Sequence, residues 1–568
     1  MGKSAALTSS LFRDRAAWIG ATFYLAIVLI LWTPFNLHSG MPFETGFVYT
    51  SEISTWWNGF LFGADLSRMH TSTFFQLGYL LGELTGVHGS FVPYQIVYAA
   101  LWWARGFLMF LIVRRLLPGQ DLLSYLAGGL VLVHSSDLAT GWVGQMPQPA
   151  YIFWMLAAFY LFVRALDQGS RVFMLLAIFC EYMSQWTYES PIAIILLAPL
   201  LLLWLRREAV HKWRAAMWGW YAVPVIYLVV TGVRYAHSGG HTYQVSVLRK
   251  DWSIAQILRD WLFNIGASVK FWTWPGGQPA RLPEGQLALL AALAVTVLIG
   301  GMIALAAWRL PEVRTILGAT AAGLVLMVFS FPAYLLLDSA RSLWRTQMLS
   351  GLGAALFLSA VIVMAASGVP AKWLRFGLLA ALSACIVWCG GYSTLAKSAN
   401  HRRFWEQHKQ AMAAVLHVAP RVKPGTLIIL TNVPGGEGDP FGRENLWFDM
   451  ALRLAYPGTR VAGAYWHKDG TPARGRRPMV DASGRWTLRD NTLLKEGGAD
   501  SILVVEYSED GHASAAPSLP DFLGFGERAS ALYNPASRIE RGPPSERAVR
   551  RYGFQRQRND SQSRSSFT

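Results

Sequence analysis

Charged residues are scarce in this sequence and cysteine is almost absent. Only 15% of the 568 residues are Asp, Glu, Lys or Arg, compared with about 25% in ordinary soluble proteins. The three cysteines, Cys180, Cys385 and Cys389, all lie inside apolar segments, so they suggest neither a disulfide framework nor a zinc site. A glycine-rich stretch at 434–442 lacks both the Rossmann spacing and the Walker lysine, and we interpret it as a flexible turn. These absences argue against a disulfide-stabilised secreted domain and against a soluble enzyme.

The few charges that are present are mostly basic, and the net charge is +16. In a soluble protein such a charge would suggest a nucleic-acid partner. Here the basic residues fall in short loops between apolar segments and near the C-terminal end, with no basic patch interleaved with aromatic residues. We therefore expect no nucleic acid and explain the charge by membrane topology.

Long apolar runs dominate the rest of the chain, which is 53% hydrophobic and contains 25 tryptophans. Eleven runs are long enough to cross a bilayer as helices. They lie near residues 17–35, 92–112, 121–135, 146–164, 172–188, 190–205, 215–235, 286–308, 315–337, 346–366 and 373–392. The first run follows Lys3, Arg13 and Arg15 and has no small-residue cleavage site, which predicts a retained signal-anchor. The fold class is therefore an α-helical polytopic membrane protein with about eleven spanning helices.

Basic residues between the runs predict the orientation, because cytoplasmic loops retain Lys and Arg. The stretch 72–87 is shorter and less apolar than the others, and we expect it to be an interfacial or re-entrant helix on the outer side. With the N-terminus in the cytoplasm, five successive basic turns then fall on the cytoplasmic side. They contain Arg114 and Arg115; Arg164 and Arg171; Arg206, Arg207, Lys212 and Arg214; Arg309 and Arg314; and Lys372 and Arg375. This pattern predicts a multi-pass protein of the cytoplasmic (inner) membrane, with all long loops and the C-terminal domain in the periplasm.

The periodicity changes after residue 395, where strands and helices alternate. We expect strands at 426–431, 460–465 and 501–506, and helices at 401–417 and 445–454. Alternation of this kind predicts a small α/β domain at 396–525, following the transmembrane domain at 1–395. From 526 to 568 large apolar residues are few and Arg, Ser, Gln and Pro are many, which predicts a basic, disordered tail.

Several ionisable residues stand near the expected outer ends of helices. A charge at membrane depth costs about 2.5–3.5 kcal/mol on insertion scales, so each one calls for an explanation. One explanation is a shared outer pocket in which a carboxylate acts as base and arginines hold a phosphate. The other is that each residue merely marks where its helix leaves the membrane. The residues concerned are Glu44, Asp65, Asp137, Glu189, Arg341 and Arg345.

Several short stretches in this region resemble the GT-C superfamily of polyprenol-dependent membrane glycosyltransferases, in its bacterial and O-mannosyltransferase-like branch. The resemblance spans roughly residues 17–395. Its elements follow the family's order, although the proline expected after Arg68 is missing and Tyr188 stands in place of a lysine. They are Arg68-Met-His-Thr-Ser-Thr-Phe-Phe through Gly86, Val92-Pro-Tyr-Gln-Ile-Val-Tyr through Arg114-Arg115-Leu, His134-Ser-Ser-Asp137 with Trp142, Tyr188-Glu189-Ser-Pro191, and Arg341-Ser-Leu-Trp344.

The resemblance implies roles for individual residues. Glu44 would be the catalytic base and Asp137 its catalytic partner, where the family usually has an acidic pair. These two carboxylates would also be the ligands of a Mg²⁺ or Mn²⁺ cofactor, which a single carboxylate would bind poorly. Carrier phosphate would be bound by Arg341 and Arg345. The remaining substrate-binding residues would be Asp65, Arg68, His134 and Glu189.

The function implied is transfer of a sugar from a polyprenyl-phosphate donor to a lipid-linked glycan, glycolipid or protein on the outer side of the membrane. Inversion at the anomeric carbon, by a single displacement, is what the resemblance implies. Two alternatives stay open. One is a lipid or polysaccharide transporter or flippase, although the sequence shows no matched pair of Gly/Pro-broken helices. The other is an inactive relative that serves as a scaffold subunit, because the first outer loop has a single carboxylate, Glu44.

Overall fold

The structure is a computed structural model of the whole chain, and it forms two units. It describes residues 14–40, 68–87, 90–205, 214–237, 248–250, 252–270, 285–306, 313–338, 340–341, 343, 345–442, 444–475, 477–489, 494–508 and 510–553. The first unit, here called the helical unit, comprises Met1–Leu37, Ser54–Gly78 and Tyr94–Asn400. The second, the α/β unit, comprises His38–Ile53, Tyr79–Pro93 and His401–Thr568.

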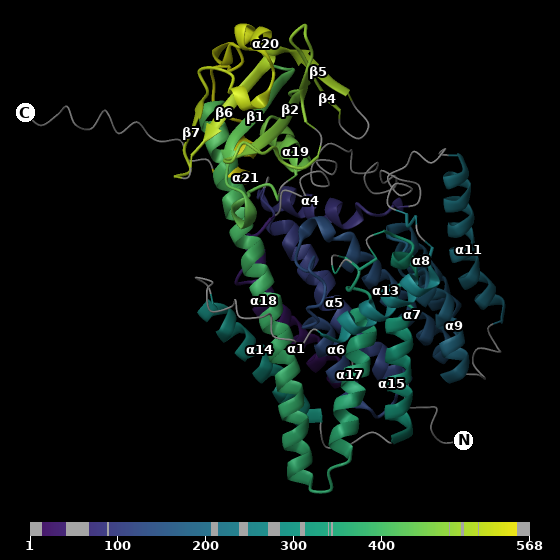
Figure 1. Ribbon diagram of the computed structural model, residues 1–568. Helices are drawn as coiled ribbons and strands as arrows, with labels where there is room; N and C mark the ends of the chain where they lie inside the picture. The colour runs from purple at the N-terminus through teal and green to yellow at the C-terminus, as the bar shows by residue number, and fades with distance from the viewer. Residues whose placement is uncertain are drawn as a thin grey trace, which may run out of the picture. The chain divides into compact units, whose positions relative to one another are not determined.

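All eleven predicted apolar runs are helices in the structure, which confirms an α-helical polytopic membrane protein (Figure 1). Six of the described helices are long and apolar enough to cross a bilayer by length and composition. The helices of these runs are α1 (Arg15–Trp32), α5 (Val92–Leu116), α6 (Asp121–Leu132), α7 (Pro147–Gln168), α8 (Arg171–Thr187), α9 (Ile192–Leu205), α11 (Arg214–His237), α14 (Gly285–Ala306), α15 (Val313–Val328), α17 (Ser350–Ser367) and α18 (Lys372–Val418). Three more helices lie between them: α4 (Thr73–Thr85), α13 (Ile254–Val269) and α16 (Pro332–Leu335).

The stretch expected to stay at the interface is helix α4, which has 13 residues. At 1.5 Å per residue it is about 20 Å long, shorter than the hydrocarbon core of about 30 Å. A helix of this length does not span a bilayer by itself, and the interfacial position of α4 on the outer side stays a prediction.

Ion pairs gather the ends of several bundle helices. Arg114, near the end of α5, pairs with Asp14 at the start of α1 and, at 3.1 Å, with Asp121 at the start of α6. Its neighbour Arg115 pairs with Asp167 near the end of α7 at 2.6 Å. Asp14 also caps α1 by accepting the backbone N–H of Ala16 at 3.1 Å. Successive helices therefore alternate in direction, and the loops after α6 and α8 lie at the opposite end of the bundle.

Glycines allow two pairs of helices to pack at backbone distance. A Cβ atom on Gly106 of α5 would lie 3.0 Å from the carbonyl oxygen of Gly128 in α6, and the reverse distance is 2.8 Å. Gly323 of α15 and Gly353 of α17 show the same relationship at 2.9 and 2.6 Å. Small residues where two membrane helices cross commonly allow their backbones to pack closely.

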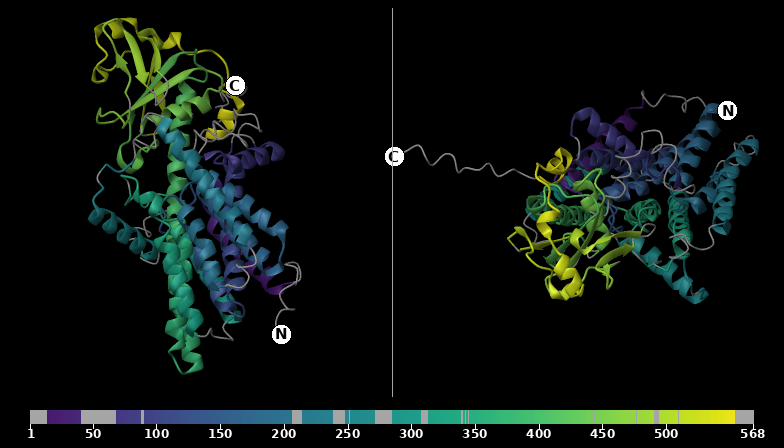
Figure 2. Two further views of the ribbon diagram at one scale, coloured as in Figure 1. Left: turned by 90° about the vertical axis from the view of Figure 1, so that its right-hand side faces the viewer. Right: turned by 90° about the horizontal axis from the view of Figure 1, so that it is seen from above.

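Helix α18 differs from the prediction of two separate helices at 373–392 and 401–417. It is continuous for 47 residues, about 70 Å, and the boundary between the two units falls inside it, after Asn400. Gly390 and Gly391 do not interrupt it, because glycine lowers helix stability by only about 1 kcal/mol and a long helix can absorb this cost. Figures 1 and 2 show α17 and α18 as consecutive antiparallel helices joined by a short turn.

The α/β unit is built on a four-stranded sheet with the strand order β2-β1-β6-β7. Strands β1 (Thr426–Val433), β2 (Val461–His467) and β6 (Ile502–Tyr507) are parallel, and β7 (Ala513–Ala515) is an antiparallel edge. Helix α19 (Asn445–Ala455) packs on β2, where Asp449 accepts the backbone N–H of Gly463 at 2.8 Å. The three predicted strands and the helix at 445–454 are thus confirmed. The β1 strand is almost wholly buried, as expected for the central strand of a parallel sheet.

The sequence did not predict a second, antiparallel sheet of β3 (Met479–Val480), β4 (Arg485–Arg489) and β5 (Leu494–Gly498). The expectation of a disordered tail from residue 526 is also corrected, since the described chain continues in ordered form to residue 553. Helices α20 (Glu527–Leu532) and α21 (Glu546–Tyr552) bury Ala529, Ala548 and Tyr552. So few apolar residues give little sequence evidence of folding, although their burial is enough to pack residues 527–552 on the α/β unit.

Candidate functional site

Asp137 lies in the loop after α6 and is completely buried. Its carboxylate accepts three backbone N–H groups: Ala139 at 2.8 Å, Arg345 at 3.2 Å and Gln347 at 2.9 Å. Burial raises the pKa of this carboxyl group, while the three hydrogen bonds and the charge of Lys397 act in the opposite direction. Asp137 therefore joins two loops that are 208 residues apart in the sequence.

Lys397 of α18 binds the same loop from another side. Its ammonium group donates to the carbonyl oxygen of Ser135 and, at 3.0 Å, to that of Asp137. Three elements therefore meet here: the loop after α6, the loop before α17, and α18.

Arg105 of α5 is a fully buried cation in the middle of an apolar helix. One of its terminal nitrogens donates to the carbonyl oxygen of Met348 at 2.7 Å, and its guanidinium lies 4.5 Å from the ring of Trp102. Within the described part of the chain, its Nε and Nη1 atoms have no hydrogen-bond partner. An arginine that is buried with unused donors is suited to an anion.

His134 borders the same group, and its Nε2–H donates to the carbonyl oxygen of Ser268 at 3.1 Å. Gly351 at the start of α17 makes room for both side chains. A Cβ atom on Gly351 would lie 2.5 Å from Arg105 Nη2 and 2.5 Å from His134 Nδ1. We therefore count Gly351 among the residues that shape the site.

Arg345 has a strained backbone. Its φ angle of +74° lies in the left-handed region, which is uncommon for a residue other than glycine. The conformation is held by the bond from its N–H to Asp137 and by the hydroxyl of Tyr334, which donates to the Arg345 carbonyl oxygen at 3.0 Å. Strain of this kind persists only where its surroundings enforce it, as they often do at functional sites.

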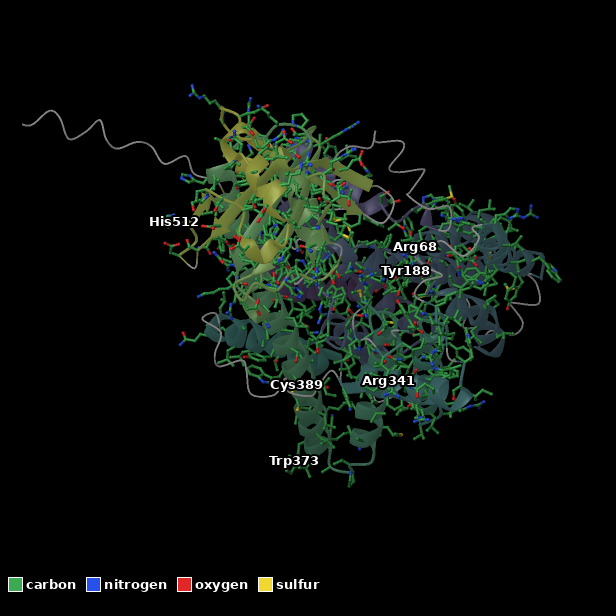
Figure 3. All side chains as sticks on the ribbon, turned by 45° about the horizontal axis from the view of Figure 1, so that its top comes forward. Arg68, Tyr188, Arg341, Trp373, Cys389 and His512 are labelled. Atoms are coloured by element: carbon green, nitrogen blue, oxygen red, sulfur yellow. The ribbon has the colours of Figure 1, made fainter. Side chains whose placement is uncertain are left out.

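Arg68 and Glu189 form a bidentate ion pair, with distances of 3.0 Å from Nε to Oε2 and 2.5 Å from Nη2 to Oε1. The Arg68 guanidinium also lies 4.3 Å from the ring centre of Tyr188, and Figure 3 shows the two side chains together. Burial lowers the pKa of Arg68, but the negative charge of Glu189 outweighs this effect and raises the pKa overall. The sequence-predicted residues Arg68 and Glu189 are thus direct partners.

A tyrosine cluster connects this pair to the Asp137 region. The Tyr188 ring stacks on Tyr151 of α7 at 5.5 Å between ring centres. Tyr334, which binds the Arg345 carbonyl, has Tyr151, Tyr188 and Glu189 in its electrostatic surroundings. Arg68, His134, Asp137, Glu189 and Arg345 therefore belong to one continuous region of the helical unit.

Arg341 is engaged elsewhere. Its Nε atom donates to Asp260 of α13 at 2.5 Å, and Asp260 also accepts from Arg249 and, at 2.7 Å, from Gln256. Burial raises the pKa of Asp260, but the hydrogen bonds and charges of Arg249 and Arg341 hold it below its usual value. Among the described contacts, the ion pair of Arg341 is with Asp260 of α13 and not with Asp137.

Two predicted site residues, Glu44 and Asp65, lie outside the residues that the structure describes. The described residues contain no group of three or more His, Cys, Asp or Glu side chains that could hold a metal ion. Asp137 is also poorly suited as a metal ligand in this conformation, because its two oxygens already accept three N–H groups. We derive no catalytic step from a metal, and the predicted Mg²⁺ or Mn²⁺ ligation by Glu44 and Asp137 stays a prediction.

Sequence analysis missed Arg105 and Lys397. Arg105 interrupts the apolar run at 92–112, and a charge inside such a run is itself a signal of function. Lys397 lies just beyond the last run, where a lysine is ordinary, so nothing local distinguished it. Tyr151 and Tyr334 carried no signal either, because aromatic residues are frequent throughout the chain.

No protein-family model matches the chain, and no curated protein matches its sequence. Among solved structures, the crystal structure of ArnT from Cupriavidus metallidurans bound to undecaprenyl phosphate is 12% identical, with a TM-score of 0.35 over 79% of this chain and 90% of that chain. The apo structure of the same protein is 14% identical, with a TM-score of 0.36 over 74% and 83%. At this identity and TM-score, the likeness assigns no role to any residue of this chain.

Proposed function

We propose that this chain is a membrane glycosyltransferase that takes a sugar from a polyprenyl-phosphate donor on the outer side of the inner membrane. The acceptor would be a lipid-linked glycan, a glycolipid or a protein. The observation that carries the proposal is the cationic group of buried Arg105 and partly buried Lys397 beside Asp137, in which Arg105 keeps two unused donors within the described structure.

The charge balance of this group favours an anionic ligand. Two cations, Arg105 and Lys397, surround one carboxylate, Asp137, whose oxygens are already engaged by backbone N–H groups. An excess positive charge away from water is costly unless an anion compensates it. The phosphate of a lipid carrier would supply that compensation, and the Nε and Nη1 donors of Arg105 would be available to it.

In the reaction we propose, a hydroxyl oxygen of the acceptor attacks the anomeric carbon. The bond from that carbon to the phosphate oxygen breaks, and its electron pair leaves with the polyprenyl phosphate. Arg105 and Lys397 stabilise the negative charge that develops on this phosphate. The hydroxyl proton passes to a carboxylate, for which Glu44 remains our candidate, and the single displacement inverts the anomeric carbon.

In this scheme Asp137 is a positioning residue, and its partnership with the base Glu44 remains a separate prediction. The contacts of Asp137 fix Arg345 and Gln347 and hold the loop before α17 against the loop after α6. The pair Arg68–Glu189 and the Tyr188 ring form a second polar wall, suited to the hydroxyl groups of a sugar. The bilayer orientation, with this region outside, follows from the positive-inside pattern of the sequence.

Binding of undecaprenyl phosphate to the purified full chain tests the proposal. We expect the lipid to stabilise the wild type against heat and expect Arg105→Gln to weaken binding at least tenfold. Arg105→Lys retains the charge but lacks the Nε and Nη1 donors of the guanidinium, and its affinity should fall between the two. Arg375→Gln, in the first turn of α18 on the opposite side of the predicted topology, is the matched control and should bind like the wild type. Equal affinity of Arg105→Gln and the wild type would overturn the assignment.

Transfer itself is tested in membranes supplied with a radiolabelled polyprenyl-phosphate sugar. We expect release of polyprenyl phosphate by the wild type and its loss in Glu44→Ala. Unchanged turnover in that variant would remove Glu44 as the base. Lipid translocation without any donor sugar, and without turnover, would instead favour a flippase.

A further inference from the structure

Helix α13 has a buried polar stripe formed by Asp260, Asn264 and Ser268. These residues are spaced by four, so they lie on one side of the helix, and all three are buried. Asp260 holds Arg249 and Arg341, as described above. A polar stripe is unusual as the inner side of an amphipathic helix, since that side is normally apolar.

The other two residues of the stripe bind both sides of the Arg345 loop. Asn264 donates to the carbonyl oxygen of Ala340 at 2.7 Å and accepts from the side-chain amide of Gln347 at 2.9 Å. Ser268 lies 2.9 Å from the Gln347 side-chain oxygen and 2.8 Å from the Ser350 hydroxyl. Through these bonds α13 holds the loop on both sides of Arg345.

The opposite side of α13 is apolar and exposed. Ile254, Leu258 and Leu262 are again spaced by four, and their exposed fractions are 75%, 49% and 69%. Residues two apart on a helix differ by about 200°, so this stripe points away from Asp260 and Asn264. Trp252 and Phe263 extend it, with exposed fractions of 55% and 42%. Such a surface is suited to the boundary between headgroups and acyl chains.

Basic residues border the apolar stripe. In the described stretch 252–270, the exposed charged side chains are Arg259 and Lys270, and the one acidic residue, Asp260, is buried and paired. Arg341 is half exposed, and its guanidinium lies 5.8 Å from the Phe263 ring centre. An apolar stripe with a basic border matches anionic lipid headgroups.

We infer that α13 is an interfacial helix that rests on anionic lipid of the outer leaflet and thereby positions the Arg345 loop. The bilayer surface fixes the position of α13 through the apolar stripe. The hydrogen bonds of the polar stripe to Ala340, Gln347 and Ser350 then fix the position of the loop. That the Arg345 loop belongs to a substrate-binding site rests on the proposed function, but the coupling of α13 to this loop does not. A protein removed from anionic lipid would keep its fold and have a looser loop.

The first test measures the depth of α13 in the membrane. A spin label is placed at Leu262→Cys in full-length protein whose native cysteines are serine, reconstituted into vesicles of phosphatidylcholine with phosphatidylglycerol. We expect more collisions with oxygen than with a water-soluble nickel chelate. A label at Met479→Cys, an exposed residue of the α/β unit, should show the reverse. The proposal fails if the two positions give the same ratio.

The second test measures coupling, with a spin label at Leu343→Cys in the loop. Leu262→Glu leaves every polar contact of α13 in place but disfavours its contact with lipid, so we expect a more mobile label than in the wild type. Asp260→Asn should have the same effect through the inner stripe, and vesicles of phosphatidylcholine alone should also increase mobility. Met479→Glu is the matched control and should leave the label unchanged.

An unchanged spectrum in Leu262→Glu would overturn the coupling even if Asp260→Asn proved too unstable to measure. Neither measurement uses a carrier lipid or a sugar. Failure of the proposed function and failure of this inference are therefore distinguishable.

Discussion

Lys397 donates a hydrogen bond to the carbonyl oxygen of Asp137 at 3.0 Å, although the two residues are 260 positions apart in the sequence. A lysine in the last membrane helix thus binds the loop after α6 to α18. Because Asp137 in turn holds the loop before α17, one cation determines how three segments meet.

Replacement of Lys397 by methionine should destabilise the protein and abolish binding of polyprenyl phosphate. Loss of a hydrogen bond to a charged group costs about 1.5–3 kcal/mol, so we expect a fall in the thermal midpoint of the purified chain in detergent. Lys409→Met is the control, because Lys409 forms a partly exposed pair with Glu406, worth about 0–1 kcal/mol. Equal effects of the two substitutions would contradict a central role for Lys397.

The ion pair of Arg68 and Glu189 should behave as a coupled unit. We expect Arg68→Glu and Glu189→Arg each to lower stability, and the double exchange to recover part of the loss, with a coupling energy of about 0.5–3 kcal/mol. A double-mutant cycle of thermal or denaturant unfolding measures this energy. Purely additive effects would show that the bidentate contact contributes nothing of its own.

Gly323 of α15 should not tolerate a methyl group. A Cβ atom there would lie 2.6 Å from the backbone nitrogen of Phe357 and 2.9 Å from the Gly353 oxygen, and backbone atoms cannot move aside as a side chain can. We expect Gly323→Ala to lower stability by about 1–3 kcal/mol, as overpacking does. Gly300→Ala in α14 is the matched control, since a Cβ atom at Gly300 has no neighbour within 4 Å. Alanine should be neutral or stabilising there.

Acid should unfold the α/β unit through His408, which lies in the part of α18 beyond the membrane run at 373–392. Burial lowers the pKa of this histidine to about 3, although its bond to the Pro440 carbonyl oxygen acts in the opposite direction. Its folded-state pKa is below the unfolded value of about 6.5. The resulting stability is present above pH 6.5 and is lost as the pH falls toward 3, with a slope of up to about 1.4 kcal/mol per unit.

His408→Gln keeps a hydrogen-bond donor but does not titrate in this range. We expect the thermal midpoint of the variant to depend less on pH between 7.5 and 4.5 than that of the wild type. The difference between the two curves isolates His408 from the other histidines. Parallel curves would show that His408 has no such effect.

The helices and the central strands were predictable because their signals are local. A run of apolar residues such as 350–367 must be a buried or membrane helix, and Thr426–Thr431 has the composition of a buried strand. The small sheet of β3 to β5 was missed because its strands have only two to five residues, and Met-Val and Leu-Lys-Glu-Gly-Gly show no strand-like alternation.

The candidate site was predictable only in part. Charges next to helix ends drew attention to Asp137, Arg68, Glu189, Arg341 and Arg345, and the structure joins four of these in one region. That Arg341 instead pairs with Asp260 depends on where α13 packs, which no local pattern specifies. Arg105 could have been found from its cost inside an apolar helix, whereas the contacts of Lys397 depend on tertiary structure alone.

The contacts of Asp137 also have a consequence for biogenesis. The loop after α6 leaves the ribosome early, while its partners Gln347 and Lys397 belong to segments synthesised much later. A nascent chain that has released only its first helices into the bilayer therefore carries the Asp137 carboxylate without two of its three N–H donors. During that interval it depends on water or on the insertion machinery, and the binding region can form only after α17 and α18 have entered the membrane.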